Sequence, residues 1–272
     1  MTRSNLKHVL ISVGVLAFVL IYLFPYTWMV LSAIRLPVDT LSLPPKLFFE
    51  VSFSGFEKVF RQTTFGQYLL NSLFITVISV TITMLIAVPA AYSLVRISKG
   101  GTAFLLAVLV ARMIPAIALA VPIYIIGSLT KQLSTYQIMV VVNVAFNLPF
   151  AIWLVRGFFM DLPANLVEAA RIDGASEWDV LTKIVAPISR GGIFATSVFV
   201  FVGAWNEFLF ALILTSGRTT TAPVALLSFR TSQGIEWDTI SAGAFMVSLP
   251  VIIFAFIMQR YLVEGLTMGA VK

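Results

Sequence analysis

The sequence predicts an all-α, polytopic membrane protein with one transmembrane domain over residues 1–272, and three observations lead to that prediction. Hydrophobic residues make up 59% of the chain and charged residues only 11%, whereas soluble domains carry about 25% charged residues. Six stretches are apolar over about the 20 residues that a spanning helix requires. The chain shows no internal repeat and no low-complexity segment. The predicted spans are approximately 9–31, 69–95, 103–127, 137–155, 192–214 and 241–261.

The first predicted span resembles a secretory signal, because Arg3 and Lys7 precede it. Its apolar run is longer than the roughly 7–15 residues of a signal peptide core, and no small-residue cleavage site follows it. We therefore expect a retained signal anchor.

Basic residues predict the orientation of the chain. The segments 1–8, 96–102, 156–190 and 260–272 contain ten Lys and Arg residues, and the segments on the opposite side contain seven. Cytoplasmic loops carry the excess of such residues, so both termini are predicted to be cytoplasmic. The net charge of +6 is spread over these loops, which is typical of an oriented membrane protein and does not indicate nucleic-acid binding.

The composition excludes the usual enzyme chemistries. The chain has no cysteine, and its one histidine, His8, lies in the N-terminal tail, so histidine-dependent triads and zinc motifs of the H-E-x-x-H type are excluded. No stretch matches the phosphate-binding pattern G-x-x-x-x-G-K-[ST]. We expect that this chain is not an enzyme and binds no metal or cofactor, and that any ATP is bound by another chain.

The loop 156–190 is much longer than a connection between neighbouring helices requires, and its residues predict two short helices. Asp161 is predicted to cap the first helix, and Gly174 stands where a left-handed residue ends one. Ser176 is predicted to cap the second helix, which Pro187 ends. An amphipathic loop lying on lipid headgroups should be rich in lysine. This loop has five acids against four bases, so we expect a protein partner.

The same loop resembles the EAA loop of binding-protein-dependent ABC permeases, and we call residues 156–190 the EAA loop. Its Glu-Ala-Ala triplet is followed by Gly174 and then by Pro187 at the family's spacing, with Ala186 in place of the usual leucine. The C-terminal residues 265–272 are similar to the end of the second permease subunit of maltose- and trehalose-type importers. Five further segments resemble those of the carbohydrate-type permeases of this family: Asn71–Leu73, Ala90–Tyr92, Ile114–Pro115, Val121–Tyr124 and Ala204–Phe208.

This resemblance implies a type I ABC importer permease that moves a carbohydrate across the bacterial inner membrane. The implied partners are a second permease subunit in a heterodimer, two ATPase subunits that hold ATP and Mg, a periplasmic or lipid-anchored sugar-binding protein, the sugar itself and membrane lipid. A C-terminal contact with the ATPase is implied for Gly269 and Lys272. The implied ATPase-coupling residues of the loop are Glu168, Ala169, Ala170, Asp173, Gly174 and Ala175.

Polar residues within the predicted spans are candidates for a substrate pathway, because a charge in hydrocarbon is costly. Arg112 and Glu207 could form a buried ion pair or act separately. Asn143 and Asn147 share one helical face, and they could bind sugar hydroxyls or join helices. The same two alternatives hold for Trp205 and Asn206.

An ion-coupled secondary carrier is the alternative function. Such carriers usually show internal repeats and intramembrane acids, whereas this chain has no repeat and only Glu207 as an acid within a predicted span. The EAA loop would have no role in a carrier. The sequence does not identify the sugar.

Overall fold

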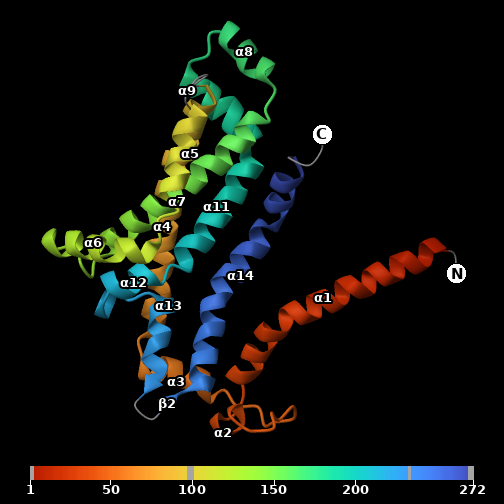
Figure 1. Ribbon diagram of the computed structural model, residues 1–272, viewed down its shortest axis with the longest axis vertical. Coiled ribbons are helices and arrows are strands. Elements are labelled where there is room, and N and C mark those ends of the chain that lie inside the picture. Colours follow the sequence, from red (N-terminus) through yellow and green to blue (C-terminus); the bar gives the residue numbers. More distant parts are fainter. Residues whose placement is uncertain (1–2, 97–100, 232–233, 269–272) are drawn as a thin grey trace. The chain divides into compact units, whose positions relative to one another are not determined.

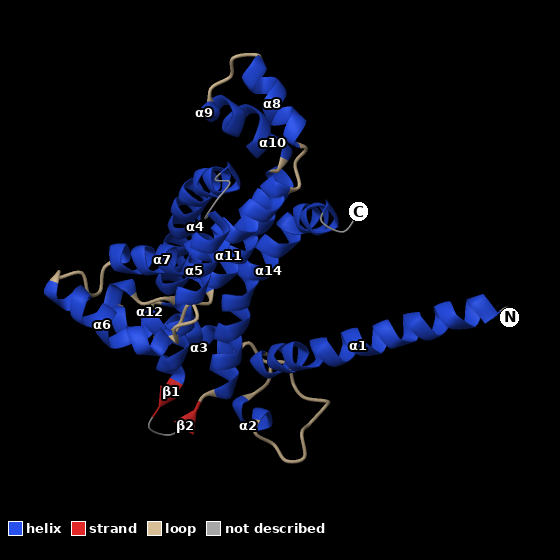
Figure 2. Cartoon of the chain, turned by 45° about the horizontal axis from the view of Figure 1, so that its top comes forward, coloured by secondary structure: helices blue, strands red, loops and turns tan. Residues whose placement is uncertain are grey.

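A computed structural model describes residues 3–96, 101–231 and 234–268 of the chain. Nearly all of its regular elements are helices. The sheet of the described residues consists of two short antiparallel strands, β1 (Arg230–Thr231) and β2 (Gly234–Ile235). The predicted all-α class is therefore confirmed (Figures 1 and 2).

The chain divides into two compact units, and each is described by itself. The first comprises Met1–Phe65 and Leu226–Ser248, and the second comprises Gly66–Ala225 and Leu249–Lys272. Helix α14 (Trp237–Met268) continues through the division. The single-domain organisation therefore stays a prediction.

In the first unit, the short helix α3 is joined to the beginning of α14. The Lys58 ammonium group binds the buried carboxylate of Asp238 at 3.1 Å. Gly55 is required there, because a Cβ atom would lie only 2.7 Å from the Asp238 carbonyl oxygen. The unit contains α1 (Arg3–Ala33), α2 (Pro37–Thr40), α3 (Ser54–Gln62), the 3₁₀ turn Leu226–Phe229, β1, β2 and the first part of α14.

The second unit is built around α7 and α11, which lie side by side (Figures 1 and 2). Ala87, Ala151 and Val200 are fully buried where α4, α7 and α11 meet. Gly192 permits close packing, because a Cβ atom there would overlap the ring of Phe158. The helices are α4 (Phe65–Arg96), α5 (Gly101–Ala111), α6 (Ala116–Leu129), α7 (Tyr136–Met160), α8 (Ala164–Ile172), α9 (Glu177–Asp179) and α10 (Ala186–Ile188) of the EAA loop, α11 (Arg190–Trp205), α12 (Leu209–Leu214) and α13 (Ala222–Ala225), with the 3₁₀ turn Gly217–Thr219.

Four of the predicted spans correspond to long apolar helices. These are α1, α4, α7 and α14, and each extends beyond the predicted bounds. Four helices of the described residues are long and apolar enough to cross a membrane, or five if the bent pair Glu177–Ile188 and Arg190–Trp205 forms one span. The count of six spans stays a prediction.

The third predicted span, 103–127, is not one continuous helix. It consists of α5 and α6, separated by residues 112–115. Pro115 stands immediately before α6, with ψ at 129°. Proline has no N–H and disfavours helical geometry in the residue before it, so the helix ends ahead of Ile114.

The fifth predicted span, 192–214, is also interrupted. Helix α11 ends at Trp205, and α12 begins at Leu209. The Glu207 carboxylate accepts hydrogen bonds from the backbone N–H groups of Phe210 and Ala211, both at 2.8 Å. Free N–H groups at a helix start need such an acceptor. Glu207 therefore starts a new helix where continuous geometry was predicted.

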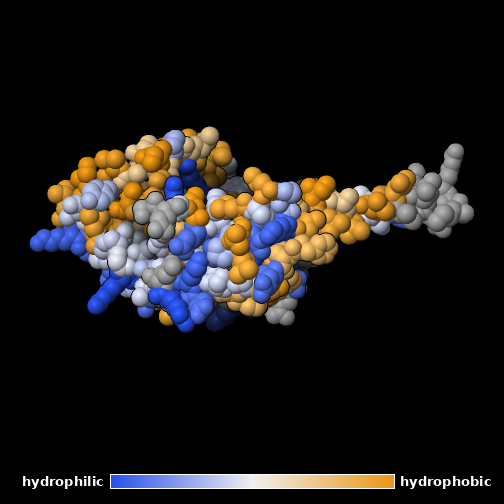
Figure 3. Space-filling view, turned by 90° about the horizontal axis from the view of Figure 1, so that it is seen from below, coloured by the Kyte–Doolittle hydropathy of each residue, from blue (hydrophilic) through white to orange (hydrophobic). Residues whose placement is uncertain are grey.

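Much of the surface is apolar. Figure 3 shows hydrophobic residues exposed over broad areas, including along α1 at its right. The most apolar window of α1 has none of its residues buried. Monomeric soluble proteins rarely expose continuous apolar surfaces of this kind. The surface is suited to contact with lipid or with other membrane helices.

Candidate functional site

The EAA loop folds into two helical segments joined by a tight turn. Helix α8 (Ala164–Ile172) is followed by α9 (Glu177–Asp179), a π-helical turn (Val180–Val185) and α10 (Ala186–Ile188), which together form the second segment. Figures 1 and 2 both place these helices at one end of α7 and α11. The second segment meets α11 at an angle of 79°. The loop is therefore a folded body.

The turn between the two segments depends on Gly174. Its φ angle is +82°, a value that L-residues with a side chain rarely adopt. The Gly174 N–H donates to the Arg171 carbonyl, and the Ala175 N–H donates to the Ala170 carbonyl, both at 3.0 Å. These bonds satisfy carbonyl groups at the end of α8. The predicted left-handed role of Gly174 is confirmed.

Ser176 caps the second segment, as predicted. Its hydroxyl oxygen accepts from the Asp179 N–H at 3.2 Å and donates to the Asp179 carboxylate at 2.5 Å. Hydrogen bonds from Lys183 and Ser176 lower the pKa of Asp179 to about 2. The ionised carboxylate accepts from the Ser176 hydroxyl and pairs with Lys183 at physiological pH.

Two details of the loop differ from the prediction. Helix α8 begins after Pro163, whose ring is tolerated before the first helical residue. Asp161 lies at the end of α7 and does not cap α8. The second segment does not end before Pro187 but continues through it to Ile188, with the proline in the first turn of α10, a position where proline is tolerated.

Apolar packing attaches the loop to the spans. Val180, Leu181 and Val185 of the second segment are at most 3% exposed. They pack with Ala170 of α8 against the ends of α4 and α7. The contacting residues of the spans are Ala91, Tyr92, Val155 and Phe159. Any displacement of the loop must therefore move α4 and α7 or break this cluster.

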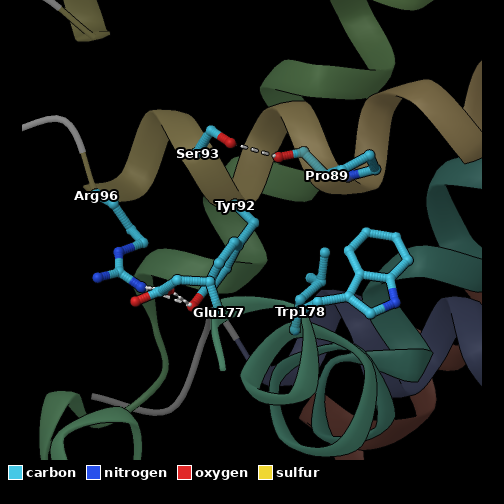
Figure 4. A pocket seen from close by; sticks show the side chains of 7 residues that line it. Pro89, Tyr92, Ser93, Arg96, Glu177 and Trp178 are labelled. Carbon is cyan, nitrogen blue, oxygen red and sulfur yellow. Dashed lines mark hydrogen bonds and ion pairs between the residues drawn. The ribbon is translucent and has the colours of Figure 1, made fainter. Parts of the chain in front are cut away.

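A polar network beside this cluster joins the loop to α4. The Tyr92 hydroxyl donates to the Glu177 carboxylate at 2.8 Å, and Arg96 donates to the Tyr92 oxygen at 2.8 Å. Arg96 and Arg171 both form ion pairs with Glu177, the second at 3.4 Å. Figure 4 shows Tyr92 and Arg96 extending from α4 towards Glu177. These three residues and Trp178 line a cavity of about 530 Å³. The carboxylate of Glu177 thus bridges the loop and α4.

Sequence reasoning missed the role of this network. In the sequence, Glu177 and Arg96 stand out only as charged residues of their loops, and Tyr92 only as part of the segment Ala90–Tyr92 that resembles the family. Glu177 and Tyr92 are 85 positions apart. No local pattern signals a contact over that separation.

The predicted coupling residues divide into a buried part and an exposed part. Ala170 is buried, and Ala175 is half-buried against the apolar cluster. Glu168, Ala169 and Asp173 are exposed. Two large apolar side chains are exposed next to them, Ile172 at 86% and Trp178 at 65%. Exposed apolar residues within a polar surface are typical of a protein-binding face.

The predicted pathway residues Arg112 and Glu207 do not form an ion pair. The Arg112 guanidinium lies over the ring of Phe150, 5.1 Å from its centroid. The Glu207 carboxylate is bound to backbone N–H groups of α12. Each residue therefore acts separately, which was one of the two alternatives.

The remaining pathway candidates differ in exposure. Asn143 and Asn147 are buried in α7, where the Asn147 amide donates to the Asn143 carbonyl at 2.8 Å. A Cβ atom at Gly203 would lie 2.7 Å from the Asn147 side-chain oxygen, so α11 approaches α7 closely there. Trp205 is buried and stacks on Phe201, whereas Asn206 is exposed at the end of α11.

The predicted C-terminal contacts at Gly269 and Lys272 lie outside the described residues. Within the described part of the chain, no three His, Cys, Asp or Glu residues are grouped to hold a metal ion.

The fold and the site together define a polytopic helical membrane protein with a folded loop that exposes polar and apolar side chains. Residues 83–268 match the family described as "Binding-protein-dependent transport system inner membrane component". The chain belongs to this family, and it is a permease subunit of an ABC importer.

Two relatives and one solved structure show the similarity. "Probable ABC transporter permease protein y4oR" of Sinorhizobium fredii is 55% identical over 95% of this chain and 92% of its own. The trehalose/maltose transport system permease protein MalG of Thermococcus litoralis is 34% identical over 100% of this chain and 99% of its own. A bacterial ABC transporter involved in the import of the acidic polysaccharide alginate has a TM-score of 0.77 at 21% identity, over 96% of this chain and 98% of its own, which shows a shared fold.

Gly174→Val is expected to loosen the turn of the EAA loop. A left-handed conformation costs a residue with a side chain about 1–2 kcal/mol, and the space around Gly174 is open, so backbone strain is the whole effect. Amide exchange of the loop in the detergent-purified protein should speed up by about tenfold. Gly174→Asn is the control, since asparagine tolerates this conformation. Equal exchange in the two variants would contradict the turn assignment.

Glu177→Gln is expected to weaken the attachment of the loop to α4. The Arg96–Glu177 pair is partly exposed, and such pairs contribute at most about 1 kcal/mol. Uptake in proteoliposomes should therefore fall by no more than about fivefold. The single variants Arg96→Glu and Glu177→Arg should each lower uptake more than Glu177→Gln does. The variant that carries both charge reversals should regain part of that uptake. No recovery in the double variant would show that the two side chains are not coupled.

Proposed function

We propose that this permease imports a carbohydrate and is driven by separate ATPase subunits that bind its EAA loop. The observation that carries the proposal is the division of the loop into buried and exposed side chains. Val180, Leu181 and Val185 pack against α4 and α7, whereas Glu168, Ile172 and Trp178 stay exposed. A body attached in this way can transfer motion from a partner to the spans, because it moves as one unit.

The substrate class is supported by the similar proteins. The Thermococcus litoralis relative is named for trehalose and maltose, and the solved structure concerns import of a polysaccharide. The relative aligns over its whole length with this chain. A sugar or polyol is therefore the proposed substrate.

The proposed coupling residues are those of the EAA motif. Glu168 and Asp173 offer carboxylates to basic or polar groups of the ATPase, and Ala169 permits close approach because its side chain is small. Ala170, Gly174 and Ala175 hold the shape of the loop from within. Gly269 and Lys272 are proposed as further ATPase contacts.

The proposed assembly is a heterodimer of this chain with a second permease subunit. Two ATPase subunits would bind ATP and Mg, and a periplasmic or lipid-anchored binding protein would deliver the sugar. Both termini and the EAA loop are proposed to lie in the cytoplasm, in keeping with the bias of Lys and Arg residues. ATP-driven closure of the ATPase pair would then rock the permease pair between inward-facing and outward-facing states.

The substrate pathway is proposed to include Arg112, Asn143, Asn147, Trp205, Asn206 and Glu207. Arg112 and Asn206 are exposed next to the two helix interruptions. Non-helical backbone at membrane depth occurs where it lines a cavity or is buried in protein. These two side chains are therefore proposed to meet the sugar directly, and the buried residues to support α7 and α11.

The first experiment is to tag the chain, extract the complex gently from its native membrane and identify the proteins that accompany it. Recovery of an ATPase and a second permease is expected. If the chain were isolated alone and catalysed uptake in liposomes without ATP, the proposal would fail in favour of an ion-coupled carrier.

Glu168→Lys is expected to lower sugar uptake by at least tenfold without preventing membrane insertion, because it reverses a charge on the exposed face. Recovery of the ATPase with the tagged variant should fall in parallel. Asp161→Lys is the matched control, since Asp161 is an exposed acid of the same loop outside the motif. Uptake at the wild-type rate in the Glu168→Lys variant would contradict the proposed role of Glu168 in ATPase coupling.

Asn206→Ala is expected to raise the KM for the sugar about fivefold to tenfold, because one hydrogen bond to a hydroxyl group contributes about 1 kcal/mol. Basal ATPase activity of the purified complex should stay unchanged. The KM is obtained from uptake measured over a range of sugar concentrations. An unchanged KM would remove Asn206 from the pathway.

A further inference from the structure

A cavity of about 400 Å³ lies between the end of α4, the end of α7 and helix α8. Three arginines from three different helices line it: Arg96 from α4, Arg156 from α7 and Arg171 from α8. Glu168 is the single acid of this lining. Cavities of this size are typical of small-molecule sites. The convergence of three guanidinium groups points to an anionic ligand.

The three arginines are not equally neutralised. Arg96 and Arg171 both pair with Glu177. Arg156 donates to the hydroxyl of Thr102 at 2.9 Å, and its Nε atom is buried without a hydrogen-bond partner in the described part of the chain. No ion pair is found for Arg156 among those residues. A buried guanidinium donor needs an acceptor, and an anion would supply it.

The rest of the lining is apolar. Val95, Phe159, Met160 and Leu162 contribute hydrocarbon surface beside the arginines. Helices α4 and α7 are two of the helices long and apolar enough to cross a membrane. Their ends are therefore where lipid headgroups meet protein. A ligand with a phosphate and a hydrocarbon portion matches this lining better than a fully polar anion.

The charge of the cavity selects among phosphates. Glu168 repels a second negative charge, and free phosphate at neutral pH carries more than one. A lipid phosphodiester carries a single charge and accepts hydrogen bonds from arginine in a fork-like geometry. We propose that this cavity binds the headgroup of an anionic glycerophospholipid, with its phosphate at Arg156 and Arg171 and its glycerol and acyl portion along Val95 and Met160. This inference rests on the proposed cytoplasmic placement of the EAA loop.

A lipid bound there would contact α4, α7 and the EAA loop at once. It would add a third attachment of the loop to the spans, besides the apolar cluster and the Glu177 network. Basic pockets between spans on the cytoplasmic side are suited to anionic headgroups. The anionic lipid content of the membrane would then tune how firmly the loop follows α4 and α7.

The test uses the whole transporter complex, purified in mild detergent after incubation with phosphatidylglycerol and phosphatidylcholine. Native mass spectrometry should show phosphatidylglycerol retained on the wild-type complex. Retention should fall at least fivefold in the double variant Arg156→Gln and Arg171→Gln. Arg190→Gln is the matched control, because Arg190 is an exposed arginine at the start of α11 outside this lining. Equal retention in the double variant and the control would overturn the proposal.

Two further experiments distinguish a bound lipid from a free anion and from a failure of the complex to assemble. If millimolar inorganic phosphate displaced the lipid from the wild-type complex, the site would belong to a free anion and the lipid assignment would be overturned. Arg156→Gln alone should also lower retention if the double variant fails to assemble. Retention is measured without transport, so lipid binding and carbohydrate uptake can fail independently. In phosphatidylcholine vesicles, added phosphatidylglycerol should raise wild-type ATP-driven uptake several-fold and leave the double variant unchanged.

Discussion

The apolar contact between the EAA loop and the ends of α4 and α7 is the interaction on which the proposed coupling depends. Val180, Leu181 and Val185 are almost fully buried there. Burial of each such side chain stabilises by about 1.5–3 kcal/mol, whereas a partly exposed ion pair contributes at most about 1 kcal/mol. Packing therefore holds the loop, and the directional bonds of Glu177 determine how it is oriented on α4.

A second constraint comes from the bilayer, which offers no hydrogen bonds to the backbone. Where α11 ends, the Glu207 carboxylate binds two N–H groups of α12. A charged residue in an apolar span thus has a structural role that requires no ionic partner. The other interruption, at residues 112–115, has a different cause, since Pro115 ends the preceding helical geometry there. In the proposed pathway, these breaks are where polar groups would meet the sugar.

The end of the bundle that carries the EAA loop combines three kinds of surface. Apolar residues hold the loop, exposed Glu168, Ile172 and Trp178 remain available to a protein partner, and Arg156 lies in a cavity suited to a lipid phosphate. The ATPase and the membrane would then act on the same folded body. Since the same loop would bind both the ATPase and the lipid, the strength of its attachment to α4 and α7 would affect how the spans respond to ATP.

The sequence by itself determined what depends on composition and on near neighbours. The apolar runs established the membrane class, Gly174 and Ser176 specified their turn and cap, and the spacing of Glu168 to Gly174 indicated the family. Only the tertiary structure decided that Glu177 meets Tyr92 and Arg96, that Arg112 and Glu207 remain apart, and that two predicted spans are interrupted. Local patterns encode helix, turn and burial, whereas contacts between distant residues depend on how the helices pack, which no single segment specifies.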